Sequence, residues 1–175
     1  MKSLLLPAAL FGLALSSPAA MAEMPEAIAA PGQTLVATLH AEGAQVYECK
    51  ADASGTLAWQ FREPVATLIE GGKTVGRHYA GPHWELADGS RIAGKLAGRA
   101  PGATPGDIPL LKLDVVARGG SGRLSDVATI QRINTKGGVA EGACPTAGAF
   151  LNVPYSADYA FYRRDRGTTG SDPAQ

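Results

Sequence analysis

The stretch Gly76-Arg-His-Tyr-Ala-Gly-Pro-His-Trp-Glu-Leu-Ala-Asp-Gly-Ser90 shows how this chain is built. It holds two turn signals, Gly81-Pro82 and Asp88-Gly89, only a few residues apart. Between these turns, Trp84 and Leu86 alternate with polar residues, which is the pattern of a half-buried β-strand. The stretch therefore predicts short antiparallel strands joined by tight turns.

The same alternation extends on both sides of this stretch. Glycine and proline separate the alternating runs, Glu42-Gly43 reads as a hairpin turn, and Pro64 reads as an interruption. No segment after residue 22 has the 3.6-residue period of an amphipathic helix. We expect one all-β domain, an antiparallel β-sandwich or barrel of about nine short strands, and the pattern alone leaves both architectures open. The clearest runs are 34–41, 45–49, 57–62, 111–117, 127–134 and 157–163.

The N-terminus reads as an export signal. Lys2 precedes an apolar run from Leu4 to Leu15, and Ala20-Met-Ala22 offers the small residues that signal peptidases require. The run is too short to span a bilayer. We expect residues 1–22 to be a signal peptide, 23–165 to form a single β domain and 166–175 to be a disordered polar tail. The mature protein is then periplasmic or secreted, with no integral membrane segment.

Charge indicates little about partners. The chain has 16 basic and 16 acidic residues, scattered rather than grouped. Nucleic-acid binding usually needs a concentrated basic face, so we expect no nucleic-acid partner. Arg163-Arg164 with Arg166 is the one basic cluster, and a solvated tail explains it. We expect a monomer.

Two cysteines, Cys49 and Cys144, lie far apart in the chain. In an exported protein an even cysteine count favours a disulfide, and two cysteines allow one intramolecular pairing. They lack the close spacing of a zinc site. We therefore predict a Cys49–Cys144 disulfide, no metal site and no cofactor.

Several short motifs follow one another in a specific order. They are Gln45-Val-Tyr-Glu-Cys49, His78-Tyr-Ala-Gly-Pro82 with Trp84, Asp88-Gly-Ser90, Ile108-Pro-Leu-Leu111, Ile130-Gln-Arg132 with Asn134-Thr135, Gly137-Gly138, Cys144, and Pro154-Tyr155 with Ala157-Asp-Tyr159. Together they resemble the exported bacterial and fungal family known as domain of unknown function 3455. The resemblance covers about Glu26 to Arg163. It implies export and implies no catalytic residue.

The chain departs from that family at two positions. Leu110 stands where the family usually has tryptophan, and His83 stands where it often has threonine. The second departure argues against a mechanism built on His83.

His78 and His83 invite a metal or acid–base interpretation, together with Glu85 and Asp88. In a regular strand the two histidines lie on opposite faces, whereas a turn at Gly81-Pro82 resets the direction and can bring them face to face. The simpler interpretation is a hairpin with two ordinary histidines.

Gln131, Arg132 and Asn134 form a second candidate group, because they place polar side chains on both faces of a mainly apolar strand. An internal hydrogen-bond network explains them, and so does the floor of a pocket in which Arg132 presents its planar donors to a ligand. In the second case we expect the site to lie near residues 130–134 and the His78-Tyr79 pair.

Tyr155 and Asp158 form a third group with Tyr159, suited to holding a sugar or to capping a barrel end. The sequence has no nucleophile elbow, phosphate loop or dinucleotide fingerprint. We therefore expect a non-enzymatic exported domain that binds a small molecule, glycan or envelope component. The alternative is a small periplasmic or secreted enzyme, metal-assisted and centred on His78 and nearby carboxylates.

Overall fold

The computed structural model describes residues 24–165, so the predicted signal peptide (1–22) and tail (166–175) lie outside the described residues. The described chain contains one short 3-10 helix followed by eight strands. These elements are η1 (Glu26–Ile28), β1 (Gln33–Ala51), β2 (Leu57–Glu70), β3 (Lys73–Tyr79), β4 (His83–Leu86), β5 (Arg91–Ala100), β6 (Leu110–Gly119), β7 (Val127–Gly137) and β8 (Phe150–Arg164).

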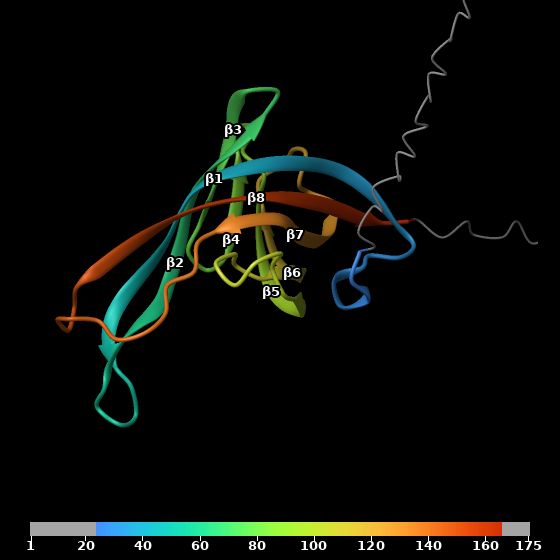
Figure 1. Ribbon diagram of the computed structural model, residues 1–175. Helices are drawn as coiled ribbons and strands as arrows, with labels where there is room; N and C mark the ends of the chain where they lie inside the picture. Colours follow the sequence, from blue (N-terminus) through green and yellow to red (C-terminus); the bar gives the residue numbers. More distant parts are fainter. Residues whose placement is uncertain (1–23, 166–175) are drawn as a thin grey trace, which may run out of the picture.

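The strands form a closed antiparallel barrel in which each strand pairs with the next in the chain. The long strands β1 and β8 close it, pairing from Gln33↔Arg164 to Glu48↔Phe150. Figure 1 shows these two strands side by side along the molecule. The predicted all-β class is confirmed, and of the two architectures that the sequence left open the barrel is the one adopted.

Residues 24–165 form eight strands, close to the expected number of about nine, and two of the predicted breaks are absent. The expected hairpin at Glu42-Gly43 lies inside β1, where Gly43 pairs with Ala66 of β2 and with Tyr155 of β8. Pro64 lies inside β2 and pairs with Gln45. Proline is tolerated there because the pairing of β2 with β3 begins only at Ala66, so Pro64 needs no donor on that side.

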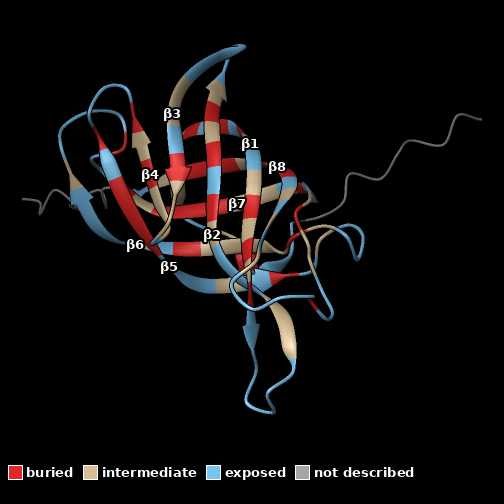
Figure 2. Ribbon diagram, turned by 90° about the vertical axis from the view of Figure 1, so that its left-hand side faces the viewer, coloured by how far each residue is buried: buried red, intermediate tan, exposed pale blue. Residues whose placement is uncertain are grey.

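Alternation along the strands places one set of side chains inside the barrel. Figure 2 marks the buried residues along the strands. Trp84, Tyr159 and Phe161 are its largest members, and each is at most 1% exposed. Trp84 meets Tyr159 and Phe161 edge to face, with ring centroids 5.3 and 6.4 Å apart. The rest of the core includes Leu39, Leu68, Ile92, Leu113, Leu124, Val127 and Ile130.

One end of the barrel carries the β2–β3, β4–β5 and β6–β7 turns and is closed by Arg123. Its guanidinium donates to both oxygens of Glu70, at 2.6 and 2.9 Å. Its backbone N–H donates to Asp88, whose other oxygen accepts from Ser90. Leu124 follows and is fully buried. This network ties three turns together and leaves the opposite end of the barrel for the site.

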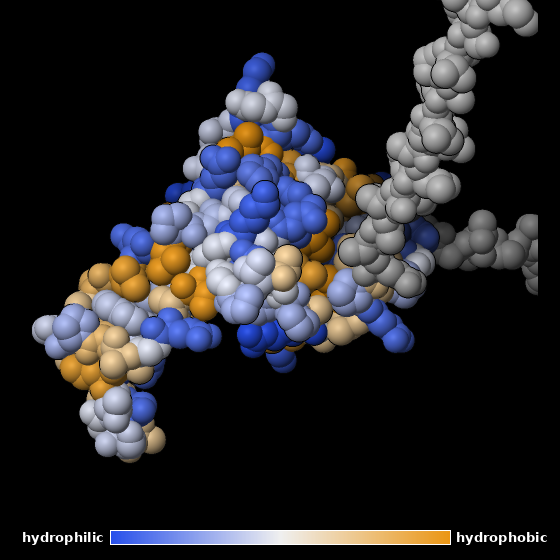
Figure 3. All heavy atoms as spheres, viewed as in Figure 1, coloured by the Kyte–Doolittle hydropathy of each residue, from blue (hydrophilic) through white to orange (hydrophobic). Residues whose placement is uncertain are grey.

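At that opposite side β1, β2 and β8 run past the barrel as a three-stranded arm, formed by residues 45–51, 57–64 and 150–153. The arm projects at the lower left of Figure 1, and Figure 3 shows hydrophobic residues on it. Phe61 and Phe150, which are more than half exposed, belong to this arm.

The arm carries the predicted disulfide, which is confirmed: Cys49 is bonded to Cys144, with their Cα atoms 5.8 Å apart. The bond holds residues 142–149, here called the strap, against the arm. Cys49 exchanges backbone hydrogen bonds with Gly148 and Ala149. On the other strand of the hairpin, the Trp59 N–H donates to Gly142 and the Leu57 carbonyl accepts from Cys144. The strap thus satisfies the backbone groups of two strands.

The helix η1 packs on the outer side of the barrel against β5 and β6. Ile28 is fully buried there, and a side chain at Gly98 would overlap the Ala27 carbonyl. Within residues 24–165, no helix has the length and apolar character needed to span a membrane.

Candidate functional site

A cavity of about 250 Å³ lies at the end of the barrel that carries the β3–β4 turn. Strands β2, β3, β4, β6, β7 and β8 and this turn contribute residues to it. The lining residues are Phe61, Arg62, Pro64, His78, Gly81, Pro82, Trp84, Leu111, Leu113, Arg132 and Tyr159. Most are apolar or aromatic, and among residues 24–165 no aspartate or glutamate lines it. Phe61, which is 54% exposed, stands where the arm meets the cavity.

His78 enters the cavity from β3 as a buried, neutral imidazole. It is 3% exposed and stacks on Trp84, with ring centroids 4.4 Å apart. Burial lowers the pKa of His78 to about 3, and the hydrogen bond to His83 opposes this shift. Nδ1 lies 2.8 Å from the His83 carbonyl oxygen. Because a carbonyl only accepts, Nδ1 carries the proton and Nε2 is left as an acceptor.

Arg132 enters the cavity from β7, paired across the sheet with Tyr159. Its Nε and Nη2 donate to the Pro109 carbonyl, at 3.0 and 2.8 Å. No carboxylate within residues 24–165 forms an ion pair with it, since Asp158 is engaged by His40 and Asn134 instead. A guanidinium has five N–H donors, so donors remain for another partner even with the Tyr159 hydroxyl beside Arg132.

Aromatic rings form the walls around these two polar groups. Trp84 is 1% exposed, and its indole N–H has no hydrogen-bond partner in the described structure. Tyr159 contacts the His78 ring at 4.9 Å, and its hydroxyl lies 3.5 Å from that of Tyr155. Burial raises the pKa of Tyr159, whereas the Arg132 charge opposes that rise. Tyr155 does not line the cavity and is 5% exposed.

The other predicted site residues lie outside the cavity. Tyr79 is on the outer face of β3 and donates to Glu85 at 2.8 Å. Gln131 faces outward beneath η1, where its Nε2 donates to the Ile28 carbonyl at 2.5 Å. Asn134 and Asp158 bond to each other on the outside, at 2.8 Å. The structure thus brings His78 and Arg132 together with Tyr155 nearby, and separates the remaining four from them.

The histidine pair does not meet across the β3–β4 turn. His78 pairs with Trp84 and faces inward, whereas His83 pairs with Tyr79 and stacks on it outside. Glu85 is also on the outer face, bound by Arg77. In the described part of the chain, no three histidine, cysteine or acidic side chains come close enough together to hold a metal ion.

Sequence reasoning did not single out Trp84, Phe61 or Leu111 as site residues. Their alternation predicts inward side chains, which is the same signal that any core residue gives. What marks Trp84 is its unpaired indole donor, and only the folded structure reveals that. Pro109, whose carbonyl orients Arg132, has no sequence signal for this role.

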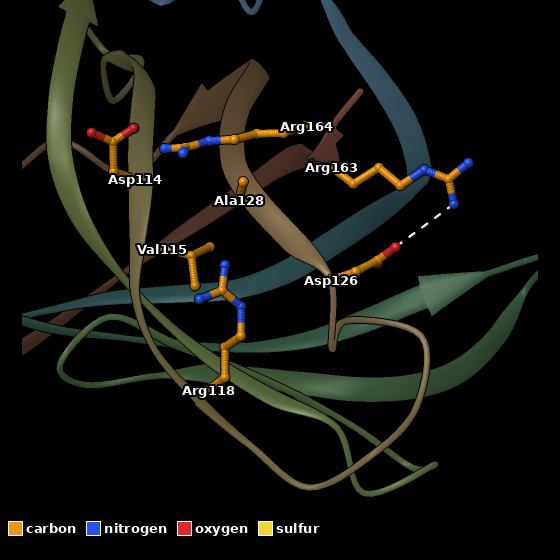
Figure 4. A pocket seen from close by; sticks show the side chains of 7 residues that line it. All are labelled: Asp114, Val115, Arg118, Asp126, Ala128, Arg163 and Arg164. Atoms are coloured by element: carbon orange, nitrogen blue, oxygen red, sulfur yellow. Dashed lines mark ion pairs between the residues drawn. The ribbon is translucent and has the colours of Figure 1, made fainter. Parts of the chain in front are cut away.

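A second cavity, of about 390 Å³, lies outside the barrel where β6 and β7 diverge. Figure 4 shows Arg118, Arg163 and Arg164 there with two carboxylates. Arg163 lies 3.7 Å from Asp126, and Arg118 donates to the Val127 carbonyl at 2.6 Å. These side chains are exposed and their charges largely offset one another. We therefore assign the candidate site to the cavity of about 250 Å³ at the end with the β3–β4 turn, here called the inner cavity, and call the second one the outer cavity.

Comparison with known proteins assigns the chain to a family but does not indicate an activity. No curated protein and no solved structure matches the chain. A family model described as "Protein of unknown function (DUF3455)" matches residues 30–163, which include every strand from β1 to β7 and nearly all of β8. All the residues that line the inner cavity fall within this match. The chain belongs to the DUF3455 family of proteins of unknown function.

Proposed function

We propose that this protein is an exported β-barrel that binds one small organic molecule in its inner cavity. The observation that carries the proposal is the presence, in an aromatic cavity, of polar side chains whose hydrogen-bonding capacity the described protein groups fill only in part. Arg132 has no carboxylate, the Trp84 indole N–H has no acceptor, and Nε2 of His78 has no recorded donor among the described residues. Buried polar groups are normally paired, so these groups indicate a missing partner.

The size of the cavity favours a small molecule over a glycan chain or an envelope polymer. Drug-sized ligands occupy pockets of about 300–1,000 Å³, and this cavity measures about 250 Å³. An eight-stranded barrel has an interior that side chains fill or that one small ligand occupies. Here core side chains fill most of the interior and leave one end for a ligand.

The disulfide supports the exported location. Disulfides form and persist in oxidising compartments such as the periplasm and the extracellular space. Cys49 is fully buried and Cys144 is nearly so, which protects the bond from reductants. Together with the predicted signal peptide, the bond supports a binding function outside the cytoplasm.

Native mass spectrometry and calorimetry on the mature protein test the proposal. We expect mass spectrometry of protein isolated from its own compartment to show one bound compound, and a panel of small acids, amines, sugars and aromatic alcohols to contain a saturable 1:1 binder. Leu111→Trp fills the cavity and should abolish binding. Leu110→Trp is the matched control, because Leu110 lies next in β6 and lines a separate surface hollow.

Two results would contradict the proposal. One is a mature, folded protein that binds nothing in the panel and carries nothing from its host. The other is binding that Leu111→Trp leaves unchanged while the variant melts cooperatively, since the ligand would then occupy another site.

A further inference from the structure

We propose that the ligand of the inner cavity is a small aromatic carboxylic acid that also carries a hydroxyl group. This inference rests on the proposed function and adds the chemical class of the ligand. In the arrangement we infer, the carboxylate accepts from Arg132, the hydroxyl donates to Nε2 of His78, and the ring lies against the aromatic wall.

Arg132 supplies the site for the carboxylate. The Pro109 carbonyl takes the Nε–H and one Nη2–H, which fixes the plane of the guanidinium. The remaining N–H groups belong to Nη1 and Nη2, the end of the fork that matches the two oxygens of a carboxylate. Arg62, the other cation of the lining, is already engaged by Glu48 and Glu63, at 3.6 and 3.2 Å. Arg132 is therefore the cation left for a ligand.

The charge of the cavity excludes an amine as the preferred ligand. Within the part of the chain that the structure describes, its lining contains two arginines and no carboxylate. His78 adds no charge, because burial keeps its imidazole neutral at physiological pH. A cationic ligand would meet Arg132 with no compensating acid, whereas an anion neutralises a partly buried charge.

His78 supplies the site for the hydroxyl. The bond from Nδ1 to the His83 carbonyl fixes the tautomer, so Nε2 only accepts. A second carboxylate oxygen at this position would face a lone pair and be repelled. A hydroxyl group donates to Nε2 and is matched. The site therefore discriminates between a hydroxy acid and a diacid.

The aromatic walls and the small volume of the cavity favour a ligand with one flat ring. Trp84 and Tyr159 are fully buried, and Phe61 stands partly exposed at the mouth. Aromatic rings favour offset or edge-to-face contacts with another ring. A cavity of about 250 Å³ accommodates one ring with two short substituents rather than a fused or branched system.

Calorimetry of the mature, disulfide-intact protein with matched probes tests the class. The probes are 3- and 4-hydroxybenzoate, the corresponding methoxybenzoates, the corresponding hydroxybenzamides, and tyramine. We expect at least one hydroxybenzoate to bind. Its methoxy analogue loses the donor and its amide loses the charge, and each should bind about 10- to 100-fold more weakly, as is usual when a partner of a buried polar group is removed. Tyramine should not bind measurably.

Variants assign the two contacts. Arg132→Met should weaken the hydroxybenzoate about 10- to 100-fold, with a smaller effect on the neutral amide. Arg132→Lys keeps the charge but lacks the paired donors of the guanidinium. Its affinity for the hydroxybenzoate should lie between those of wild type and Arg132→Met. His78→Phe keeps a ring against Trp84 and should abolish the preference for hydroxy over methoxy. Arg164→Met removes an arginine of the outer cavity and should leave binding unchanged.

The outcomes separate this inference from the proposed function. If a neutral or cationic compound binds in the cavity, as shown by its loss in Leu111→Trp, and no hydroxybenzoate does, the ligand class is wrong and the proposed function stands. If no compound binds at all, both fail. If hydroxybenzoate binds equally well to wild type, Arg132→Met and Arg132→Lys, the assignment of the carboxylate to Arg132 is overturned.

Discussion

Trp84 is the residue at which the core and the candidate site meet. Its indole stacks on His78 and touches the rings of Tyr159 and Phe161, so it packs against strands β3 and β8 at once. It also lines the inner cavity, and its buried indole N–H has no partner among the described residues. Trp84 therefore contributes to the stability of the fold and, by our proposal, to ligand binding.

The contrast between Trp84 and its neighbour His83 gives a residue-scale prediction. Trp84→Ala should lower the free energy of unfolding by about 3–5 kcal/mol, because it empties the centre of the core. His83→Thr should cost no more than about 1 kcal/mol, since His83 lies outside and makes one hydrogen bond, to the Ala80 carbonyl. Denaturant midpoints measure both. The reverse order would mean that the register of β4 is wrong.

A second residue-scale prediction concerns acid. The folded pKa of His78 is lowered to about 3 by burial, below its ordinary value of 6.5. The unfolded chain therefore binds a proton at His78 between these values, and stability present above pH 6.5 is lost as pH falls. From pH 7.5 to 5.0 the free energy of unfolding should fall by about 2 kcal/mol.

Denaturant titrations of wild type and two variants test this effect. His78→Phe should lose most of the decrease, while His83→Thr should retain it. Paired carboxylates such as Asp88 do not confound the measurement, because unfolded carboxyl groups take up protons mainly below about pH 4.5. Equal pH slopes in wild type and His78→Phe would show that another group is responsible.

At this scale, the sequence predicts inward apolar residues well and polar roles poorly. Alternation places Trp84 and Phe161 inside, and both are buried. It cannot distinguish Arg132, which faces the cavity, from Gln131, which is equally polar and buried beneath η1 on the outer face. The covering helix lies about a hundred residues away in the chain, so no local pattern reports it.

Among the individual elements, β1 shows why the number of strands could not be predicted correctly from the sequence. Locally, Glu42-Gly43 has the composition of a hairpin turn. In the barrel it is extended, because β2 and β8 pair with it from both sides. Non-local pairing therefore overrides the local turn preference, and two predicted strands become one.

Gly43 gives the element-scale prediction. An added Cβ would overlap the Val65 carbonyl oxygen of β2, which is backbone and cannot move aside. Gly43→Ala should cost about 1–3 kcal/mol, as overpacking does. Gly119→Ala in β6 is the matched control: there the nearest atom is the end of the flexible Arg91 side chain, 3.1 Å from the added Cβ. We expect it to stay within about 1 kcal/mol of wild type.

Thermal and denaturant unfolding of Gly43→Ala and Gly119→Ala test this prediction. Equal stability of Gly43→Ala and wild type would mean that β1 and β2 are further apart at this position, as a local turn would place them.

At the scale of the whole molecule, closure determines both the fold and the candidate site. Sandwich and barrel share the same strand pattern, and the choice depends on the pairing of β1 with β8, the two ends of the domain. Closure also brings His78 of β3 and Arg132 of β7 into one cavity. The sequence predicted that these two residues mark a site, since both are polar in apolar strands. It could not predict that Tyr79 and Asp158 would face away.

The disulfide provides the prediction at this scale. Cys49 and Cys144 are 95 positions apart, and the chain-entropy model gives a loop of that length about 4–5 kcal/mol as an upper guide. Reduction should lower the melting temperature by roughly 10 °C for a domain of this size. The double variant Cys49→Ala/Cys144→Ala should do the same, and thiol labelling of the unreduced, denatured mature protein should find no free cysteine.

The position of the bond determines which parts of the molecule respond to its loss. The strap makes its backbone hydrogen bonds to the arm at Cys49, Leu57 and Trp59, whereas Trp84 lies inside the barrel and pairs with β3 and β5. Below the lowered melting temperature, the reduced protein should therefore keep the near-ultraviolet dichroism of its packed core and exchange the amide hydrogens of the arm faster. Loss of the core signal on reduction at 25 °C would show that the strap holds the whole barrel closed. An unchanged melting temperature would show that the arm's hydrogen bonds suffice without the covalent link.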